Sequence, residues 1–392
     1  MQLWAWYWHL RTLSDQPMVI SGIGLVRFLP VILLSIVAGV IADRVNRRKM
    51  AILTQLGLTF VAMILGLVTS VGVMTLWLLF ALAAAQSVVV AFDVPARQAI
   101  IPSLVPRQDL ANAYSLNTIA SKVGGILGPA LTGVVIAFWG LQWAYWINAL
   151  SYLAVIAALI AMGDVQYQVE KKSFGMRETW GEVKEGFKFI TGTPIIFSVM
   201  ILDFFGTFFS SANTLLPFVA RDILHVGPIQ YGWLSASQSM GTLLVGLYLS
   251  QKNYLQRQGM LISISVAMFG GATILFGLST SFWLTMTALI LIGVFDGLSS
   301  IIRNTVRQIL TPDEMRGRMI SITQIFFKGG PQLGEMESGL VAQILGVPFA
   351  IISGGVGCVL AALIVVKRIP QLWQFNGDEQ IQSDLRSVQL ER

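Results

Sequence analysis

The sequence has little charge. Only 12% of its 392 residues are Asp, Glu, Lys or Arg, whereas a soluble globular domain carries about 25%. Apolar residues take their place: 55% of the chain is hydrophobic, and its mean hydropathy is +0.71. The apolar runs are too many and too long to be buried in one soluble core. This composition excludes an ordinary soluble protein and predicts an all-α polytopic membrane protein.

The sequence also has few residues that bind metals or form disulfides. Cys358 is the single cysteine, which excludes an intrachain disulfide and a cysteine-based metal cluster. The only histidines, His9 and His225, are isolated, and a structural role is expected for both. The chain contains neither a His-Glu-x-x-His pattern nor a GxxxxGK[ST] nucleotide-binding loop. We therefore expect no metal, no cofactor, no direct ATP drive and no enzymatic activity.

Twelve apolar runs are expected to cross the membrane, in two sets of six. The first run, Gln2–Leu13, offers about a dozen residues where a spanning helix needs roughly 20. We therefore expect an incomplete first helix in a chain that lacks a segment at its N-terminus. The runs cover residues 1–13, 18–41, 50–71, 74–94, 112–138 and 141–163, and then 194–220, 228–250, 259–279, 282–301, 318–342 and 346–366.

Four regions follow from these runs. They are an N-terminal helical bundle (1–163), a cytoplasmic linker with an amphipathic helix (164–193), a C-terminal helical bundle (194–366) and a cytoplasmic tail (367–392). Five residue pairs in the two bundles lie 206 positions apart, which indicates a duplicated six-helix unit. The pairs are Arg97 and Arg303, Pro106 and Pro312, Ser115 and Ser321, Gly128 and Gly334, and Gly133 and Gly339.

The basic residues are not spread evenly. A net charge of +6 would fit a nucleic-acid partner, but Lys and Arg cluster in alternate loops, as they do on the cytoplasmic side of membrane proteins. Arg221, beside Asp222, is the main exception. We predict a multi-pass protein of the plasma (inner) membrane, with both termini of the intact chain in the cytoplasm and no nucleic-acid partner.

The loop between the second and third runs carries a specific pattern. It reads Gly-x-x-x-Asp-Arg-x-x-Arg-Arg, and it resembles the loop signature between helices 2 and 3 of the major facilitator superfamily of transporters. The glycine allows two helices to approach closely, and the aspartate can accept from the first N–H groups of the next helix. The resemblance implies a conformational-switch loop made of Gly39, Asp43, Arg44, Arg47 and Arg48.

Further stretches extend the resemblance over the whole chain. They are Asp93–Ala99, Val105–Asn117 and Arg303–Ser321, and they resemble the branch of the superfamily that includes enterobactin exporters and macrolide-efflux proteins. This resemblance implies two six-helix bundles around a central cavity that opens alternately to each side. Charged residues at the cytoplasmic helix ends then form a candidate cytoplasmic gate: Asp93, Arg97, Arg107, Asp296, Arg303 and Arg316.

The fifth run contains a glycine and proline pattern, Gly124, Gly128, Pro129 and Gly133. Small residues four apart let a neighbouring helix pack closely, and the proline bends the helix. The pattern resembles the motif of drug/proton antiporters in this superfamily. The alternative is a tightly packed, kinked helix with no role in coupling.

Charged residues inside the apolar runs are the best candidates for mechanism, because each is costly in hydrocarbon. A proton-coupled carrier needs a carboxylate whose pKa changes as its surroundings become wet or dry. The alternative is that these residues form buried ion pairs that hold helices in register. The candidates for proton coupling or substrate binding are Asp203, Glu335, Glu337, Arg27, Lys122 and Lys328.

An aromatic cluster near the N-terminus, Trp4, Trp6, Tyr7 and Trp8, fits an aromatic belt at the membrane interface. If some of the rings face inward, they suit flat amphipathic compounds. The favoured function is proton-coupled export of small amphipathic molecules, such as drugs or siderophores, by a monomer in the lipid bilayer. The alternatives are facilitated diffusion or import of a small metabolite, and a non-transporting membrane sensor.

Overall fold

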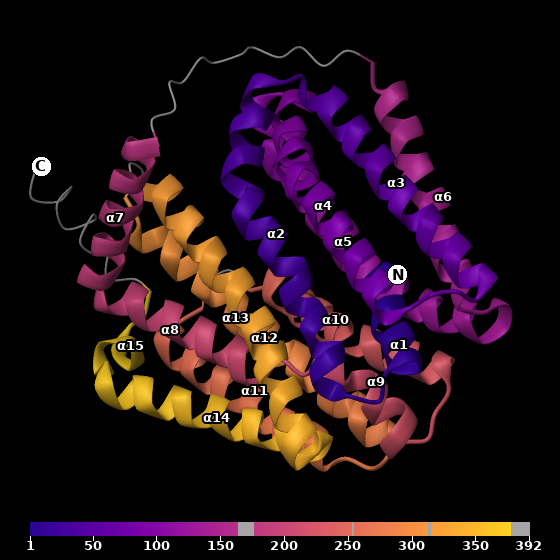
Figure 1. Cartoon of the computed structure of the whole chain (residues 1–392). Helices are drawn as coiled ribbons and strands as arrows, with labels where there is room; N and C mark the ends of the chain where they lie inside the picture. The colour runs from indigo at the N-terminus through magenta and orange to yellow at the C-terminus, as the bar shows by residue number, and fades with distance from the viewer. Residues whose placement is uncertain (164–175, 253–254, 313–314, 378–392) are drawn as a thin grey trace, which may run out of the picture. The chain divides into compact units, whose positions relative to one another are not determined.

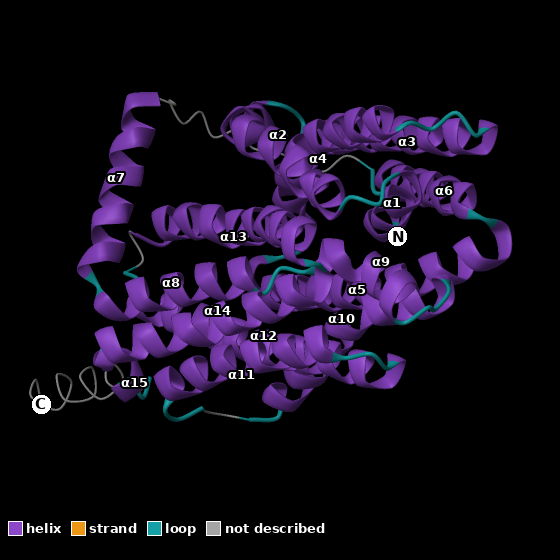
Figure 2. Ribbon diagram, turned by 60° about the horizontal axis from the view of Figure 1, so that its bottom comes forward, coloured by secondary structure: helices purple, strands orange, loops and turns teal. Residues whose placement is uncertain are grey.

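The computed structural model describes residues 1–163, 176–252, 255–312 and 315–377. Within these residues the chain is helical and contains no strand (Figures 1 and 2). Nine of the described helices are long and apolar enough to cross a membrane. The predicted all-α class therefore holds over the described part of the chain.

Each of the twelve expected runs corresponds to a helix. The first set consists of α1 (Gln2–Leu13), α2 (Pro17–Arg44), α3 (Arg47–Val71), α4 (Leu76–Leu104), α5 (Leu110–Trp139) and α6 (Leu141–Ala161). The second set consists of α8 (Pro194–Phe209), α10 (Pro228–Ser250), α11 (Gln258–Leu278), α12 (Phe282–Leu310), α13 (Arg316–Leu345) and α14 (Val347–Arg368).

Two helices are longer than the apolar runs that predict them. We expected ends near residues 94 and 301, but α4 and α12 continue to Leu104 and Leu310. Hydropathy marks only the part of a helix that needs hydrocarbon around it, so the more polar last turns of both helices were missed. The extension occurs at the same place in both halves, as the 206-residue repeat requires.

The chain forms two compact units. The first contains Met1–Phe174 and Thr214–Ala236, and the second contains Gly175–Asn213 and Ser237–Arg392. In the first unit α3 packs against α4 and α6, which run side by side with it in Figure 1. In the second unit α11 packs against α12 and α14 in the same way. Helices at equivalent positions of the repeat therefore have equivalent neighbours.

Glycines allow the closest helix crossings in the second unit. A Cβ atom on Gly270 of α11 would lie 2.7 Å from the Gly355 carbonyl oxygen of α14, and a Cβ on Gly355 would meet the Gly270 carbonyl at the same distance. A Cβ on Gly241 of α10 would lie 2.0 Å from the Ile290 carbonyl oxygen of α12. Such backbone contact is how helices gain packing energy in lipid.

The seventh run is not one continuous helix. α8 ends at Phe209, and the backbone from Ser210 to Ala212 is irregular. A 3₁₀ turn (Asn213–Leu215), the single turn α9 (Leu216–Phe218) and a π-helical turn (Val219–Ile223) follow. Ser338 of α13 donates a hydrogen bond to the Ser211 carbonyl, 3.0 Å away, which satisfies part of the broken backbone.

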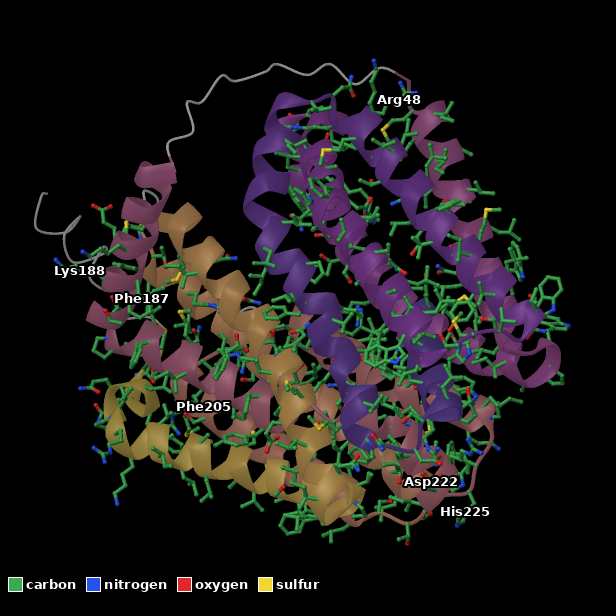
Figure 3. The ribbon with its side chains drawn as sticks, in the orientation of Figure 1. Arg48, Phe187, Lys188, Phe205, Asp222 and His225 are labelled. Carbon is green, nitrogen blue, oxygen red and sulfur yellow. The ribbon has the colours of Figure 1, made fainter. Side chains whose placement is uncertain are left out.

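The structure also contains helices outside the expected membrane runs. The expected amphipathic helix is α7 (Met176–Gly192); its Ile190 is buried against Met319 and Ile322, whereas Phe187 and Lys188 are exposed (Figure 3). The first part of the expected tail forms a short helix, α15 (Pro370–Gln374), which follows α14. Leu372 and Phe375 are buried.

Candidate functional site

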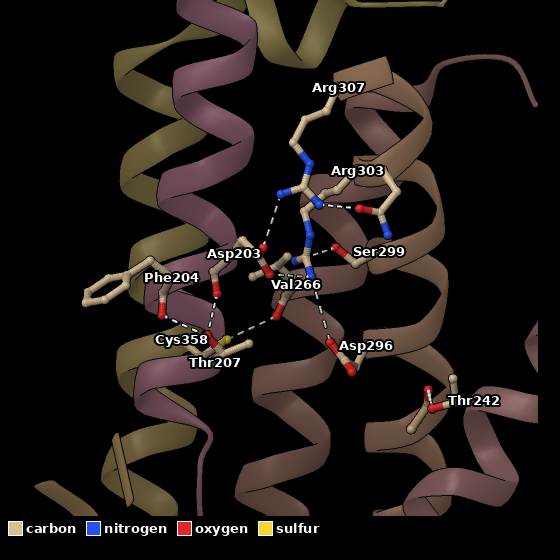
Figure 4. A network of polar contacts seen from close by, with 12 residues as sticks. Asp203, Phe204, Thr207, Thr242, Val266, Asp296, Ser299, Arg303, Arg307 and Cys358 are labelled. Carbon is tan, nitrogen blue, oxygen red and sulfur yellow. Dashed lines mark hydrogen bonds and ion pairs between the residues drawn. The ribbon is translucent and has the colours of Figure 1, made fainter. Parts of the chain in front are cut away.

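The second unit contains a buried ion pair within its membrane helices (Figure 4). Asp203 of α8 and Arg303 of α12 are only 2% and 3% exposed, and Arg303 Nη2 lies 2.8 Å from Asp203 Oδ1. Arg303 also donates a hydrogen bond to Ser299, one turn earlier on α12, at 2.9 Å. Because a lone buried charge would be very costly, each residue supplies the counter-charge of the other.

A second arginine shares the same carboxylate. Arg307 Nη1 lies 3.5 Å from Asp203 Oδ2, and its guanidinium also donates to Asn304. Asp296, one third exposed, lies 3.8 Å from Arg303 at the edge of the cluster. The cluster therefore holds two arginines and two carboxylates, and only Asp203 is fully buried between both arginines.

This geometry bears on two predictions. Asp203 was expected either to couple protons or to form a buried ion pair, and it does form the pair. Asp296 and Arg303 were expected to act together at a cytoplasmic gate, but Arg303 makes its shorter contact with Asp203. Hydropathy located Asp203 within an apolar run but gave no signal for its partner, because Arg303 lies on another helix, a hundred residues away.

Two other predicted carboxylates lie on α13. Glu335 is 7% exposed and stands between Gly334 and Ser338, the residues that meet the end of α8. A Cβ on Gly334 would lie only 2.0 Å from the Phe208 carbonyl oxygen. Glu337 is half-buried. Glu335 is therefore a buried carboxylate on the helix that packs against the break in the seventh run.

The first unit has a polar cluster around Asp93, which is 1% exposed on α4. Its carboxylate accepts hydrogen bonds from Thr54 (3.0 Å) and Gln55 (2.8 Å) of α3. It also accepts from Arg97 Nε at 2.7 Å, one turn later on α4. Both carboxylate oxygens thus have partners, and the cluster joins α3 to α4.

The basic loop is described in part. Arg48 donates to the Leu159 and Ile160 carbonyls at 2.7 and 2.8 Å, so it caps the C-terminal end of α6, where positive charge is favoured (Figure 3). The Asn46 side chain accepts from the Lys49 N–H and caps α3. Arg47 is half-buried. The side chains predicted at Gly39, Asp43, Arg44, Arg107, Arg316 and Lys328 lie outside the described residues.

The glycine pattern of α5 makes one very close contact. A Cβ on Gly133 would lie 2.3 Å from the Pro228 carbonyl oxygen and 2.9 Å from Gly232 Cα of α10. A Cβ on Gly232 would in turn lie 2.8 Å from the Pro129 carbonyl oxygen. Gly124 has no such neighbour within 4 Å among the described residues. The predicted close packing is therefore found at Gly133, and the described part of the chain shows none at Gly124.

The segment Thr214–Ala236 meets α1 and α2 within the first unit. Arg11 of α1 donates to Asp222 at 2.8 Å and also pairs with Asp15. Ser21 of α2 and Thr214 are both fully buried and lie 2.9 Å apart. Sequence reasoning noted the Arg221–Asp222 exception in the outer loop but missed Arg11 as the partner of Asp222.

The aromatic cluster at the start of the chain is largely internal. Trp6 and Tyr7 are 2% and 1% exposed, so the interpretation as an interfacial belt is wrong for these two rings. Trp4 and Trp8 pack against Tyr231, whose hydroxyl donates to the Trp4 carbonyl at 3.1 Å. The half-buried rings of Trp4 and Trp8 join α1 to the beginning of α10.

Two of the candidates for proton coupling or substrate binding are basic residues of the first unit. Arg27 of α2 is half-buried, and its guanidinium carbon lies 5.6 Å from the centre of the Trp6 ring. Lys122 of α5 is exposed. No group of three or more His, Cys, Asp and Glu that could hold a metal occurs among the described residues.

Residues 1–390 match the family described as "Transmembrane secretion effector" (MFS_3). The chain belongs to this family. It is 26% identical over 343 residues to the enterobactin exporter EntS of Citrobacter koseri and 24% identical to that of Escherichia coli O1:K1. Each of these alignments covers 86% of this chain and 80% of the relative.

Solved structures agree on the fold. A POT family transporter in complex with 5-aminolevulinic acid superposes with a TM-score of 0.75 at 13% identity, covering 94% of this chain and 93% of that one. A bacterial homologue of the human lysosomal transporter Spinster gives 0.70 at 16% identity, covering 94% and 95%. The predicted major facilitator fold is confirmed, and the chain is a multi-pass inner-membrane transporter of a small molecule and not an enzyme.

Proposed function

We propose that this protein exports a siderophore-like small molecule by alternating access. The observation that carries the proposal is the similarity to two enterobactin exporters over 86% of the chain. The proposal includes a monomer in the lipid bilayer and both termini of the intact protein in the cytoplasm. It disfavours nutrient import and the sensor hypothesis, because neither explains a relationship to exporters.

We also propose that export is coupled to inward proton flow, with Glu335 as the group that exchanges the proton. Neutralising Asp203 would leave Arg303 and Arg307 buried without the carboxylate they share. Asp203 therefore suits a permanent counter-charge better than a proton carrier. Glu335 is buried on α13, and its neighbours in sequence contact the broken end of α8. A change in the charge of Glu335 would therefore occur close to the irregular backbone that follows α8.

Alternating access requires contacts that form in one state and separate in the other. We assign an outer seal to the contacts that join α1, α2 and α5 to Thr214–Ala236: Arg11 with Asp222, Ser21 with Thr214, and Gly133 with Gly232. The predicted gate residues act on the cytoplasmic side of the membrane. Within the first unit, the contact of Asp93 with Arg97 and the cap that Arg48 forms on α6 stabilise that side.

Substrate-triggered proton release tests this proposal. The protein is placed in inside-out membrane vesicles with an acidified interior, enterobactin-type catecholates are added, and the internal pH is followed with a dye. We expect catecholate to release protons with the wild type and with Glu337→Gln, the matched control on the same helix. Glu335→Gln should abolish release but still exchange substrate across the membrane. Substrate equilibration without proton release in the wild type would favour facilitated diffusion instead.

A further inference from the structure

A buried polar group in the first unit has no partner in the described structure. Trp6 is 2% exposed, yet its indole N–H has no hydrogen-bond acceptor among the described residues. Buried tryptophans usually find such an acceptor, because a buried donor without one has lost its hydrogen bond to water and gained nothing in exchange. An orphaned donor inside a transporter is therefore a reason to look for a ligand that supplies the acceptor.

A cation lies beside this donor. The Arg27 guanidinium carbon is 5.6 Å from the centre of the Trp6 ring, close enough for a cation–π contact. No carboxylate among the described residues lies within 4.0 Å of the Arg27 side chain. Arginine inside a membrane span normally pairs with a carboxylate or faces a path for ions or substrate.

The other charged residues of the first unit indicate whether a ligand beside Trp6 and Arg27 would be an anion or a cation. Asp93, the fully buried carboxylate of the first unit, is already saturated by Thr54, Gln55 and Arg97. Asp222 pairs with Arg11 at the end of α1. Lys122 of α5 adds a second cation to the spans of this unit. The described spans of the first unit therefore have more positive than negative charge available.

We propose that Trp6 and Arg27 form a subsite for an anionic oxygen group of an aromatic substrate. The planar guanidinium suits two oxygens of a carboxylate or catecholate, and the indole N–H donates to one of them. Two donors that have no acceptor among the described residues favour an anion over a cation, and a neutral ring would supply no charge opposite the arginine. The proposal rests on the proposed export function and adds residues and ligand chemistry to it.

Direct binding tests the subsite without requiring transport. The full chain is reconstituted in lipid nanodiscs, and binding of 2,3-dihydroxybenzoate, benzoate and neutral catechol is measured by calorimetry. Arg27→Gln should weaken binding of the anions at least about tenfold and leave catechol unchanged. Trp6→Phe keeps a ring but removes the N–H, and it should weaken anion binding about threefold to tenfold. Arg221→Gln, an exposed arginine in the same unit, is the charge-matched control and should change nothing.

Comparing the three ligands shows which ligand oxygens contact Trp6 and Arg27. Tight binding of both benzoate and dihydroxybenzoate indicates carboxylate contact, whereas binding of dihydroxybenzoate alone indicates the catecholate oxygens. Arg27→Lys keeps the charge but not the planar fork, so it should bind anions more tightly than Arg27→Gln and more weakly than the wild type; this graded order of affinities separates loss of the contact from misfolding. No anion binding by the wild type, or equal losses for anions and catechol, would overturn the subsite.

The binding experiment in nanodiscs and the proton-release experiment in vesicles can fail independently of each other. Arginine-dependent anion binding without proton release would remove the coupling proposal and leave the subsite. Proton-coupled export with anion affinity unchanged in Arg27→Gln would remove the subsite and leave the proposed function.

Discussion

At the scale of single residues, the buried charges of the second unit are interdependent. Asp203 lies between Arg303 and Arg307, and all three side chains are almost entirely buried. Removing one partner of a buried ion pair leaves the other charge uncompensated, which typically costs about 3–5 kcal/mol. The stability of the second unit should therefore depend on the negative charge at position 203.

We predict that Asp203→Asn lowers the thermal unfolding temperature of the purified protein, corresponding to a loss of about 3–5 kcal/mol. Asp296→Asn is the matched control, because Asp296 is one third exposed and lies 3.8 Å from Arg303; its effect should be clearly smaller. Adding Arg307→Gln to Asp203→Asn should recover part of the loss. Equal effects of the two aspartate substitutions would show that the network does not depend on Asp203.

Hydropathy locates such charges but not their partners. The sequence identified Asp203, Arg27, Lys122 and Glu335 because each interrupts an apolar run. The pairing of Asp203 with α12 depends on how helices pack, and a spacing of about a hundred residues carries no signal for that. The same limit explains why Arg11 and the orphaned Trp6 N–H were missed: both become informative only once α1 is placed against its neighbours.

At the scale of helices, prediction from the sequence was more complete. Long apolar runs separated by polar loops indicate helix positions in a membrane protein, since a helix satisfies its backbone hydrogen bonds within itself in lipid and about 20 apolar residues give it the length to span. The break after Phe209 was missed because Ser210 and Ser211 lie within an otherwise apolar stretch. Their small polar side chains were the available signal, and the neighbouring glycines of α13 and α14 provide the space.

The crossing of α5 and α10 gives a prediction at this scale. Gly133→Ala places a methyl group where the Pro228 carbonyl oxygen lies 2.3 Å away, so the helices must separate. We expect reduced thermal stability and loss of most catecholate export. Gly124→Ala, on the same helix but with no neighbour within 4 Å, should leave both unchanged. Unfolding temperature and vesicle transport measure the two effects; a tolerated Gly133→Ala would mean that α5 and α10 do not pack this closely in the membrane.

At the scale of the whole molecule, the internal repeat was visible in the sequence and recurs in the packing. The 206-residue offset predicted equivalent helices, and α3 and α11 have equivalent neighbours. The repeat did not predict that Thr214–Ala236, which follows α8, packs with the first unit. That segment is held by side-chain contacts with α1 and α2 and by the backbone crossing with α5, and the repeated residues of the sequence do not encode these contacts.

The outer seal leads to a prediction about the conformational equilibrium of the whole transporter. Asp222→Asn removes the charge that links Arg11 to the segment after α9, and it should shift the population toward the outward-open state. Because Cys358 is the only cysteine, Cys358→Ala provides a background for a reporter, Ser21→Cys. Ser21 is fully buried against Thr214, so its labelling by a maleimide added from outside reports opening.

We expect Asp222→Asn to raise the labelling rate at position 21 several-fold. Asp15→Asn is the matched control, because Asp15 also pairs with Arg11 but lies only four residues away from it and makes no ion pair with the described residues of Thr214–Ala236. It should leave the rate unchanged. An equal increase in both variants would mean that the charge of Arg11, and not its link to Asp222, controls access. An unchanged rate in Asp222→Asn would place the outer seal in the glycine crossing of α5 and α10, where backbone contact alone holds the segment closed.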